Sequence, residues 1–448
     1  MAKNSITDYD NIANNNTDIQ SVDIAENCAP SGINNAIREM MADLADVNDG
    51  TVALTSPKVG SLTTDTISES TSGNGVAVDG MTIKDGAVGT TASPATANLT
   101  AINGGQIGGR RNMIINGDMR IDQRNSGGLV TGSAAVAKYA ADRFYLYANT
   151  TATITMQQVS DAPSGFFNSN KITCTAAATG DVSGSRVQFG QVLEGYDTAH
   201  LNFGTGNAKT ITLSFWVKAS NTGNYGGSFT NGSGAARCHP FSYTVNSANT
   251  WERKTITISG DTAGTWTASN TANLIVLWGL GVGSNYEGPA GQWNDEFDIA
   301  PASSFSLKDN LNATWQITGV QLEVGSVATE FEHRSYGEEL ALCQRYYQFA
   351  DNNGGTYVVG PATCGFTHAP SSIATSVQLR TSPTITLLGA WSFRQGGSDT
   401  GITGVYTSIP ASGMLLIDYA LASSPGNGIA GNIMVYGAGS GFKLDAEL

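Results

Sequence analysis

The residues best suited to chemistry in this sequence are aromatic side chains in turn-rich stretches. Trp266 follows a Gly-Asp-Thr-Ala-Gly-Thr turn, and Tyr286 and Trp293 flank Glu-Gly-Pro-Ala-Gly-Gln just ahead of Asp295. Loop rings of this kind stack on flat C–H faces, while neighbouring amides and carboxylates bind hydroxyl groups. Trp266, Tyr286, Trp293 and Asp295 are therefore our candidates for binding a carbohydrate, with local packing as the alternative for each ring.

Motifs for catalysis are missing from the sequence. The four histidines are far apart, and no HExxH, GxSxG or phosphate-binding GxxxxGK[ST] pattern occurs. Asp295, Glu296 and Asp298 form the dense acidic patch of the central region, which we interpret as a solvated loop, leaving a bound Ca²⁺ open. We predict no enzyme activity and no cofactor, although a carboxylate pair assembled by folding is left open.

The charge balance argues against nucleic acid as a partner. Only 13% of the residues are charged, and 23 Lys and Arg against 37 Asp and Glu give a formal net charge of −14. A local cluster comprises Arg110, Arg111, Arg120 and Arg124. We expect these arginines to pair with nearby Asp118 and Asp122 or to join neighbouring subunits.

The apolar and cysteine patterns bear on the compartment. The longest apolar run, residues 274–282, is about half a membrane span, so we expect no membrane insertion. Residues 1–10 lack the features of a signal peptide, and the five cysteines are spread singly. Both observations predict free thiols in a protein made in a reducing cytoplasm.

Residues 1–50 hold nine acidic and two basic residues, a net of −7, which is half of the charge of the chain. Ser31 and Gly50 are placed to begin and end a helix. Its apolar positions follow the 4, 3, 4, 3 spacing of a coiled-coil seam and are Ile33, Ile37, Met40, Leu44 and Val47. We predict a short parallel helical bundle here, with packing on a neighbouring domain as the alternative.

The next two regions differ in how much apolar sequence they carry. Residues 51–109 are rich in Gly, Thr, Ser and Ala with short alternating runs, which favours an intertwined β shaft over a flexible linker. Residues 110–333 contain recurrent strand patterns and predict a jelly-roll β-sandwich. In the strand at 210–217, Ile, Leu, Phe and Val alternate with Thr and Ser, as in a half-buried antiparallel strand. We expect Trp216, Trp278 and Trp315 in the core.

The spacing of apolar residues changes twice after residue 333, from strand-like to helical and back. Ser335-Tyr-Gly-Glu338 is a capping-box pattern that predicts a helix within residues 334–350. Residues 351–448 return to strand patterns and predict a small terminal β domain.

Three stretches resemble bacteriophage tail-fibre and receptor-binding proteins. DIQSVDIAENCAPSGINNAIRE at 18–39 is similar to the virion-attachment end of such fibres, and residues 66–86 are similar to a recurrent shaft segment. The region from NMIINGDMRIDQR at 112–124 to QITGVQLEVG at 316–325 resembles their carbohydrate-binding-module-like β domains. The resemblance implies a homotrimer with its N-terminus on the virion, and it carries no catalytic residue.

Together these patterns predict a mainly β, elongated homotrimer with a short helical bundle, a β shaft, a jelly-roll sandwich, a short helix and a terminal β domain. The function we expect is adsorption. The N-terminus would attach to a phage tail or adaptor protein, and the β domains would bind a host surface polysaccharide. The alternatives are a tailspike-like polysaccharide depolymerase and a structural virion decoration fibre.

Overall fold

The computed structural model describes residues 8, 15–25, 27–49, 109–132, 136–232, 236–351, 356–411 and 414–448. The chain divides into two compact units, residues 1–97 and 98–448, which are taken in turn. Apart from residue 109, the β shaft predicted for residues 51–109 lies outside the described residues.

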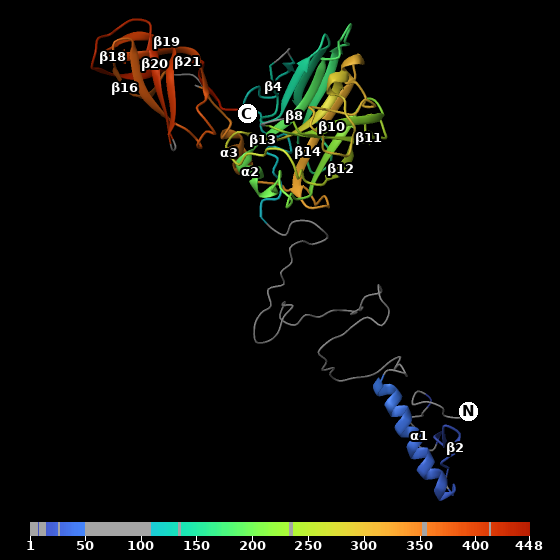
Figure 1. The fold of residues 1–448 in the computed structure, drawn as a ribbon. Coiled ribbons are helices and arrows are strands. Elements are labelled where there is room, and N and C mark those ends of the chain that lie inside the picture. Colours follow the sequence, from blue (N-terminus) through green and yellow to red (C-terminus); the bar gives the residue numbers. More distant parts are fainter. Residues whose placement is uncertain are drawn as a thin grey trace. The chain divides into compact units, whose positions relative to one another are not determined.

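The first unit contains the predicted N-terminal helix (Figure 1). Its elements are β1 (Asp18–Ile19), β2 (Val22–Asp23) and α1 (Pro30–Asp49). The β1–β2 hairpin packs on one flank of α1, where Ile19 and Ala36 are buried and Gln20 Nε2 donates to Asp43 Oδ1 at 2.8 Å. The hairpin therefore covers the helix positions near residues 36 and 43.

The positions predicted to form a seam lie on a different face of α1. The exposed fractions are 50% for Ile33, 46% for Ile37, 39% for Met40 and 51% for Leu44, and Val47 is half-buried. In the described part of this unit, the apolar stripe of α1 therefore stays largely open to solvent.

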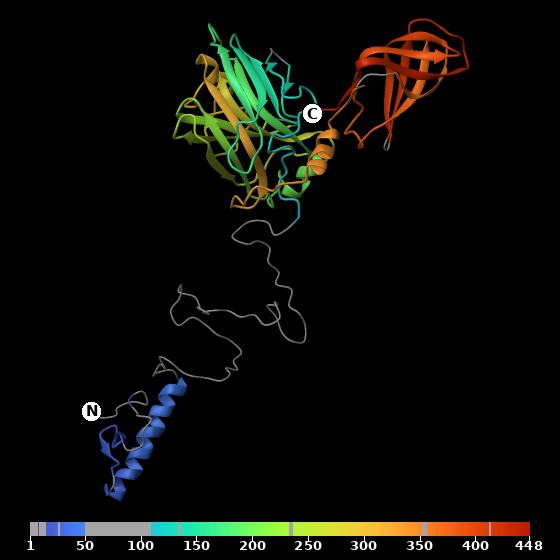
Figure 2. The ribbon, with the colours of Figure 1, turned by 180° about the vertical axis from the view of Figure 1, so that it is seen from behind.

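The second unit begins with a sandwich of two antiparallel sheets, which confirms the mainly β prediction (Figures 1 and 2). In spatial order, the first sheet contains β11 (Cys238–Val245), β10 (Gly223–Asn231), β13 (Ala272–Val282), β8 (Arg186–Glu194), β5 (Tyr145–Asn149) and β4 (Lys138–Tyr139). The second contains β12 (Glu252–Ile258), β9 (Ile211–Ala219), β14 (Thr314–Val324), β7 (Ser169–Ala176), β6 (Thr153–Val159) and β3 (Val130–Thr131). A one-turn helix, α2 (Gly195–Thr198), follows β8.

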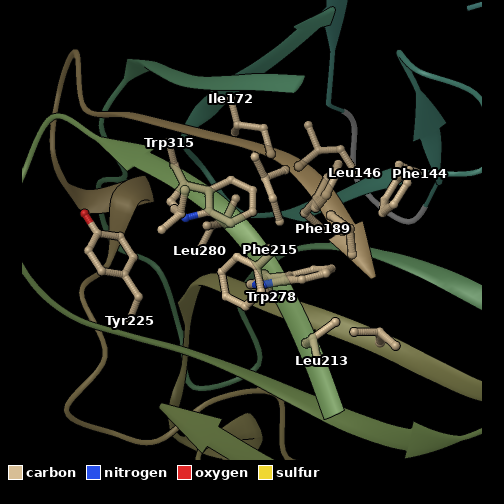
Figure 3. Close-up of a cluster of buried hydrophobic side chains, with 14 of the residues drawn as sticks. Phe144, Leu146, Ile172, Phe189, Leu213, Phe215, Tyr225, Trp278, Leu280 and Trp315 are labelled. Atoms are coloured by element: carbon tan, nitrogen blue, oxygen red, sulfur yellow. The ribbon is translucent and has the colours of Figure 1, made fainter. Parts of the chain in front are cut away.

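The core of the sandwich is aromatic and is shared by both sheets (Figure 3). Phe189 of β8 contacts Trp315 of β14 at 5.6 Å between ring centroids, and Trp278 of β13 contacts Phe215 of β9 at 5.4 Å. Trp278 and Trp315 are fully buried, as expected. Large rings from facing strands thus fill the space between the sheets, and such aromatic pairs add stability beyond their buried area.

The expectation for Trp216 was wrong. The alternation of β9 that turns Phe215 inward turns Trp216 to the outer face, where it is half-buried. The polar residues of this face are nevertheless covered, because Thr212 is fully buried and its Oγ1 donates to the backbone oxygen of Gly325 at 2.8 Å. The backbone just after β14 therefore covers the first residues of β9, whereas Trp216 and Lys218 stay half-buried on the outer face.

The predicted helix between the two β regions is α3 (Tyr336–Gln344). Half of its capping box forms, because Ser335 Oγ accepts a hydrogen bond from the Glu338 amide at 3.3 Å. The Glu338 carboxylate pairs instead with Arg110. No helix in the described ranges combines the length and the apolarity that a membrane span requires.

The chain continues into a third, seven-stranded antiparallel sheet. Its strands are β15 (Tyr347–Asp351), β16 (Thr356–Cys364), β17 (His368–Ala374), β18 (Thr384–Gln395), β19 (Ser398–Ala411), β20 (Met414–Leu421) and β21 (Ile429–Asp445). The long β21 pairs with β15 and β16 along one edge and with β18 along the other. A separate core, in which Trp391 stacks on Tyr419 at 5.9 Å, lies within this sheet.

Candidate functional site

Two of the candidate tryptophans meet at one side of the sandwich. Trp266 lies in the loop between β12 and β13, and Trp293 lies in the loop that follows β13. Their rings pack edge to face at 5.8 Å and 87°, and Phe203 contacts both, at 4.9 Å and 5.8 Å. Phe203, Trp266 and Trp293 are called the aromatic cluster below.

Hydrogen bonds fix both indoles in place. Trp293 Nε1 donates to the backbone oxygen of Ser259 at 2.9 Å. Trp266 Nε1 lies 3.2 Å from both Asp261 Oδ2 and the backbone oxygen of Ala263. Because both ring N–H groups are already satisfied and both rings are half-buried, they present a preset surface rather than free donors.

The charged neighbours of the aromatic cluster centre on Arg237. Its guanidinium forms a bidentate pair with Asp261, at 2.9 Å and 2.5 Å, and its remaining nitrogen bonds Asp295 at 2.5 Å. The hydrogen bonds to Asp261 raise the pKa of Arg237. Asp261 is buried, whereas the side chain of Asp295 is 85% exposed. Asp295 therefore offers solvent a carboxylate whose position one arginine sets.

Strand β11 is hydrogen-bonded to the loop that carries Trp293 and Asp295. Cys238 and Asn294 exchange backbone hydrogen bonds at 3.0 Å and 2.9 Å, which ties the 291–298 loop to β11. Burial raises the pKa of the Cys238 thiol to about 11. The next residue, His239, packs edge-on against Trp293 at 5.3 Å, and burial lowers the pKa of its imidazole. Both groups are therefore neutral at physiological pH and serve to support the loop.

Tyr286 belongs to a different cluster. The guanidinium of Arg186 lies 4.5 Å from the Tyr286 ring centroid, 4.7 Å from that of Tyr147 and 5.4 Å from that of Phe297. These rings belong to a small apolar group on β5, β8 and the loop after β13. The fold thus joins Trp266, Trp293 and Asp295 but places Tyr286 in a separate cation–π arrangement.

The arginine cluster is partly local, as predicted. Arg120 pairs with Asp118 at 2.9 Å. The guanidinium of Arg124, in contrast, reaches Asp445 at 2.8 Å, while Asp122 accepts hydrogen bonds from backbone amides of the turn that follows it. Asp118 thus pairs with an arginine as expected, whereas Asp122 does not pair with Arg124, whose partner comes from the end of the chain. The alternative, that these arginines join neighbouring subunits, stays a prediction.

The acidic patch next to the aromatic cluster does not stay together in the fold. Asp298 is buried and accepts from Asn294 Nδ2 at 3.1 Å, while Glu296 stays exposed. In the part of the chain that the structure describes, no group of three or more His, Cys, Asp or Glu residues is arranged to hold a metal ion.

Sequence reasoning missed the residues that organise this cluster. Phe203, Arg237 and His239 come from other strands and loops, and no local pattern marks them. Asp261 carried one signal, since it stands in the turn that leads to Trp266.

Comparison with known proteins finds distant structural likeness only. No family model matches the sequence, and no curated protein matches it. A family 11 carbohydrate-binding module from Clostridium thermocellum, solved with a β-1,3-1,4-mixed-linked tetrasaccharide, is 10% identical over 47% of this chain and 100% of that chain, with a TM-score of 0.23. A CBM4 structure is 17% identical over 47% of this chain and 97% of that chain, with a TM-score of 0.26.

The enzymatically active domain of bacteriophage CBA120 tailspike protein 4 is also similar. It is 12% identical over 48% of this chain, with a TM-score of 0.26. The match spans 21% of that tailspike chain, so it concerns about a fifth of its length.

Proposed function

We propose that the central sandwich binds a cell-surface glycan at the aromatic cluster and does not cleave it. The observation that carries this proposal is the pair of indoles, Trp266 and Trp293, held at right angles beside the exposed carboxylate of Asp295. A sugar ring offers an apolar C–H face and a rim of hydroxyl groups, and this surface offers a ring for the first and a charged acceptor for the second.

Preorganisation supports the same proposal. Because the indole N–H groups are bonded to Ser259 and Asp261, the rings have little rotamer freedom left to lose when a ligand binds. Arg237 likewise holds Asp295 in place. Binding at such an open surface is weak for one copy and gains strength when several copies engage one polysaccharide.

Substitution of Trp293 tests the proposal directly. The full chain and its Trp293→Ala variant are titrated against purified capsular and lipopolysaccharide-derived polysaccharides of candidate host bacteria. We expect on the order of tenfold weaker binding for the variant, as for the loss of one stacking contact, with an unchanged far-ultraviolet spectrum.

A matched control is Trp251→Ala, another half-buried tryptophan, which contacts Lys218 and Asp161 instead of the aromatic cluster. It should bind normally. If Trp293→Ala bound every polysaccharide as the intact chain does, the assignment of this site would be wrong.

We further propose that the chain is a homotrimeric phage fibre located on the virion tail, attached through residues 1–50 to a tail or adaptor protein. The support is the sequence resemblance together with the open face of α1, where Ile37 and Leu44 are about half exposed. Apolar residues at a and d positions bury this stripe when parallel helices associate.

Light scattering after gel filtration tests the assembly. A trimer has three times the 46.5 kDa of one chain. We expect Ile37→Glu combined with Leu44→Glu to lower the mass, whereas Met41→Glu, an exposed position outside the seam, should not. A folded monomer for the unaltered chain would contradict the proposal.

New reducing ends after incubation with a bound polysaccharide would favour the depolymerase alternative.

A further inference from the structure

The terminal β domain carries a groove of about 450 Å³ that the sandwich site does not involve. It lies over β16, β17 and β20 and is lined by Pro361, Pro370, Ser372, Leu416 and Asp418 among others. This volume is within the roughly 300–1,000 Å³ of small-molecule sites.

Strand alternation explains why the groove is partly apolar. In β20, Leu415, Ile417 and Tyr419 point into the core, so Leu416 and Asp418 point outward. The register of β17 with β20 places Pro370 opposite Asp418 and Ser372 opposite Leu416. Leu416 is 45% exposed, although the residues on either side of it in β20 are buried. An apolar strip therefore adjoins a carboxylate on the outside of the domain.

Only one oxygen of the Asp418 carboxylate has a hydrogen-bond partner among the described residues. Its Oδ2 lies 3.1 Å from His368 Nδ1. Its Oδ1 is buried from solvent and accepts no hydrogen bond from any residue that the structure describes. Leaving a buried oxygen without a hydrogen bond destabilises the folded state. The side chain of Asp418 is nevertheless 26% exposed, so a ligand in the groove can reach part of this carboxylate.

An exposed aromatic ring, which is not part of the groove lining, packs on the histidine that contacts this carboxylate. Tyr406 packs edge-on against His368 at 4.4 Å and 84°, and it remains 67% exposed. His368 thus links Asp418 on one side to Tyr406 on the other. A strip of apolar carbon, a partly exposed carboxylate and an open ring therefore lie on the outer side of the domain.

We propose that this groove is a second carbohydrate-binding site, which takes one sugar ring. The apolar face of the sugar lies on Pro370 and Leu416, and one of its hydroxyl groups donates to the Asp418 carboxylate, whose side chain is 26% exposed. The class of ligand, a carbohydrate, is taken from the proposed function. The location of the site is argued from the groove alone. It makes each chain bivalent, so that one polysaccharide can engage the sandwich and the terminal domain together.

Calorimetric titration of the full chain with the same purified polysaccharides, and with methyl glycosides of their component sugars, tests the second site. We expect Asp418→Ala to remove one of two sugar sites per chain, with residual affinity there lowered on the order of tenfold. Met414→Ala, an exposed residue of the same strand face outside the groove lining, should keep both sites. If Asp418→Ala does not fold, Leu416→Gln replaces it, because that position is already exposed.

The outcomes separate the two proposals. Loss of one site in Asp418→Ala and of the other in Trp293→Ala supports both. If Trp293→Ala loses all binding, the groove is not a sugar site and the sandwich site stands. If Asp418→Ala loses all binding, the sandwich site is overturned and the groove stands. Unchanged binding in both groove variants overturns the groove. A lower oligomeric mass for Leu416→Gln also overturns it, because the groove is then an interface between copies of the chain. An intact chain that binds no member of the panel overturns both sites.

Discussion

Asp142 is a carboxyl group that the fold removes from water completely. Burial raises its pKa to about 7, against the lowering effect of hydrogen bonds from Gln123, whose Nε2 lies 2.6 Å from Asp142 Oδ2. The folded state therefore prefers the protonated acid. At a pH between 3.8 and about 7, the unfolded chain ionises this carboxyl group while the folded chain keeps it protonated.

This group should make the protein less stable as the pH rises. Because the folded pKa is higher than the unfolded one, its stabilising contribution is complete below pH 3.8 and is lost as the pH rises to about 7. We expect the free energy of unfolding of the unaltered chain to fall, relative to that of Asp142→Asn, by a few kcal/mol between these limits. Urea denaturation at a series of pH values measures the difference, and parallel curves for the two proteins would refute the assignment.

At the residue scale, the sequence marked the right kinds of side chain but not their partners. Trp266 and Trp293 were singled out from loop composition and their rings pack together, while Asp295 is connected to them through Arg237 and Asp261. The alternative of local packing is also part of the structure, since Phe203 contacts both indoles. Arg237 carried no signal, because an ion pair with Asp261 depends on where two separate loops lie in space.

Helix α3 shows how the residue that precedes a helix can stabilise its start. Ser335 Oγ accepts from the Glu338 amide, while the Glu338 side chain is occupied by Arg110. The cap therefore depends on the serine alone. The capping-box pattern was enough to locate the helix start, but the pairing of Glu338 depended on a segment more than two hundred residues away.

We expect Ser335→Ala to lower the free energy of unfolding by about 1 kcal/mol, because one backbone donor at the helix start loses its acceptor. Ser335→Asp should retain most of the stability, since a carboxylate accepts the same hydrogen bond and suits the positive end of the helix dipole. Thermal denaturation of both variants checks this. Equal losses in the two would show that the cap does not hold the helix.

At the scale of the whole second unit, the end of the chain is tied back to the sandwich. Glu447 pairs with Arg143 and with Arg124, the latter at 3.2 Å. Arg143 is 2% exposed, and although burial alone would lower its pKa, the Glu447 carboxylate raises it. The charge of Arg143 is thus tolerated because a residue near the end of the chain neutralises it.

We expect Glu447→Ala to cost about 3–5 kcal/mol of stability, because it leaves the buried Arg143 without a counter-charge. Asp445→Ala is the matched control: its carboxylate is 39% exposed and also pairs with Arg124, so its loss should cost about 0–1 kcal/mol. Chemical denaturation of both variants measures the ratio. Similar costs would contradict a special role for the buried pair.

Spacing along single elements was enough to predict the mainly β class, helix α1, helix α3 and the inward residues of β9. The packing of separate elements was needed to show that the outer face of β9 at Trp216 is partly covered, that Tyr286 lies in another cluster, and that Arg124 pairs with the end of the chain. Periodicity reports on neighbours within a strand or helix. Which loops and ends meet depends on the packing of separate elements, and no spacing along the chain records that.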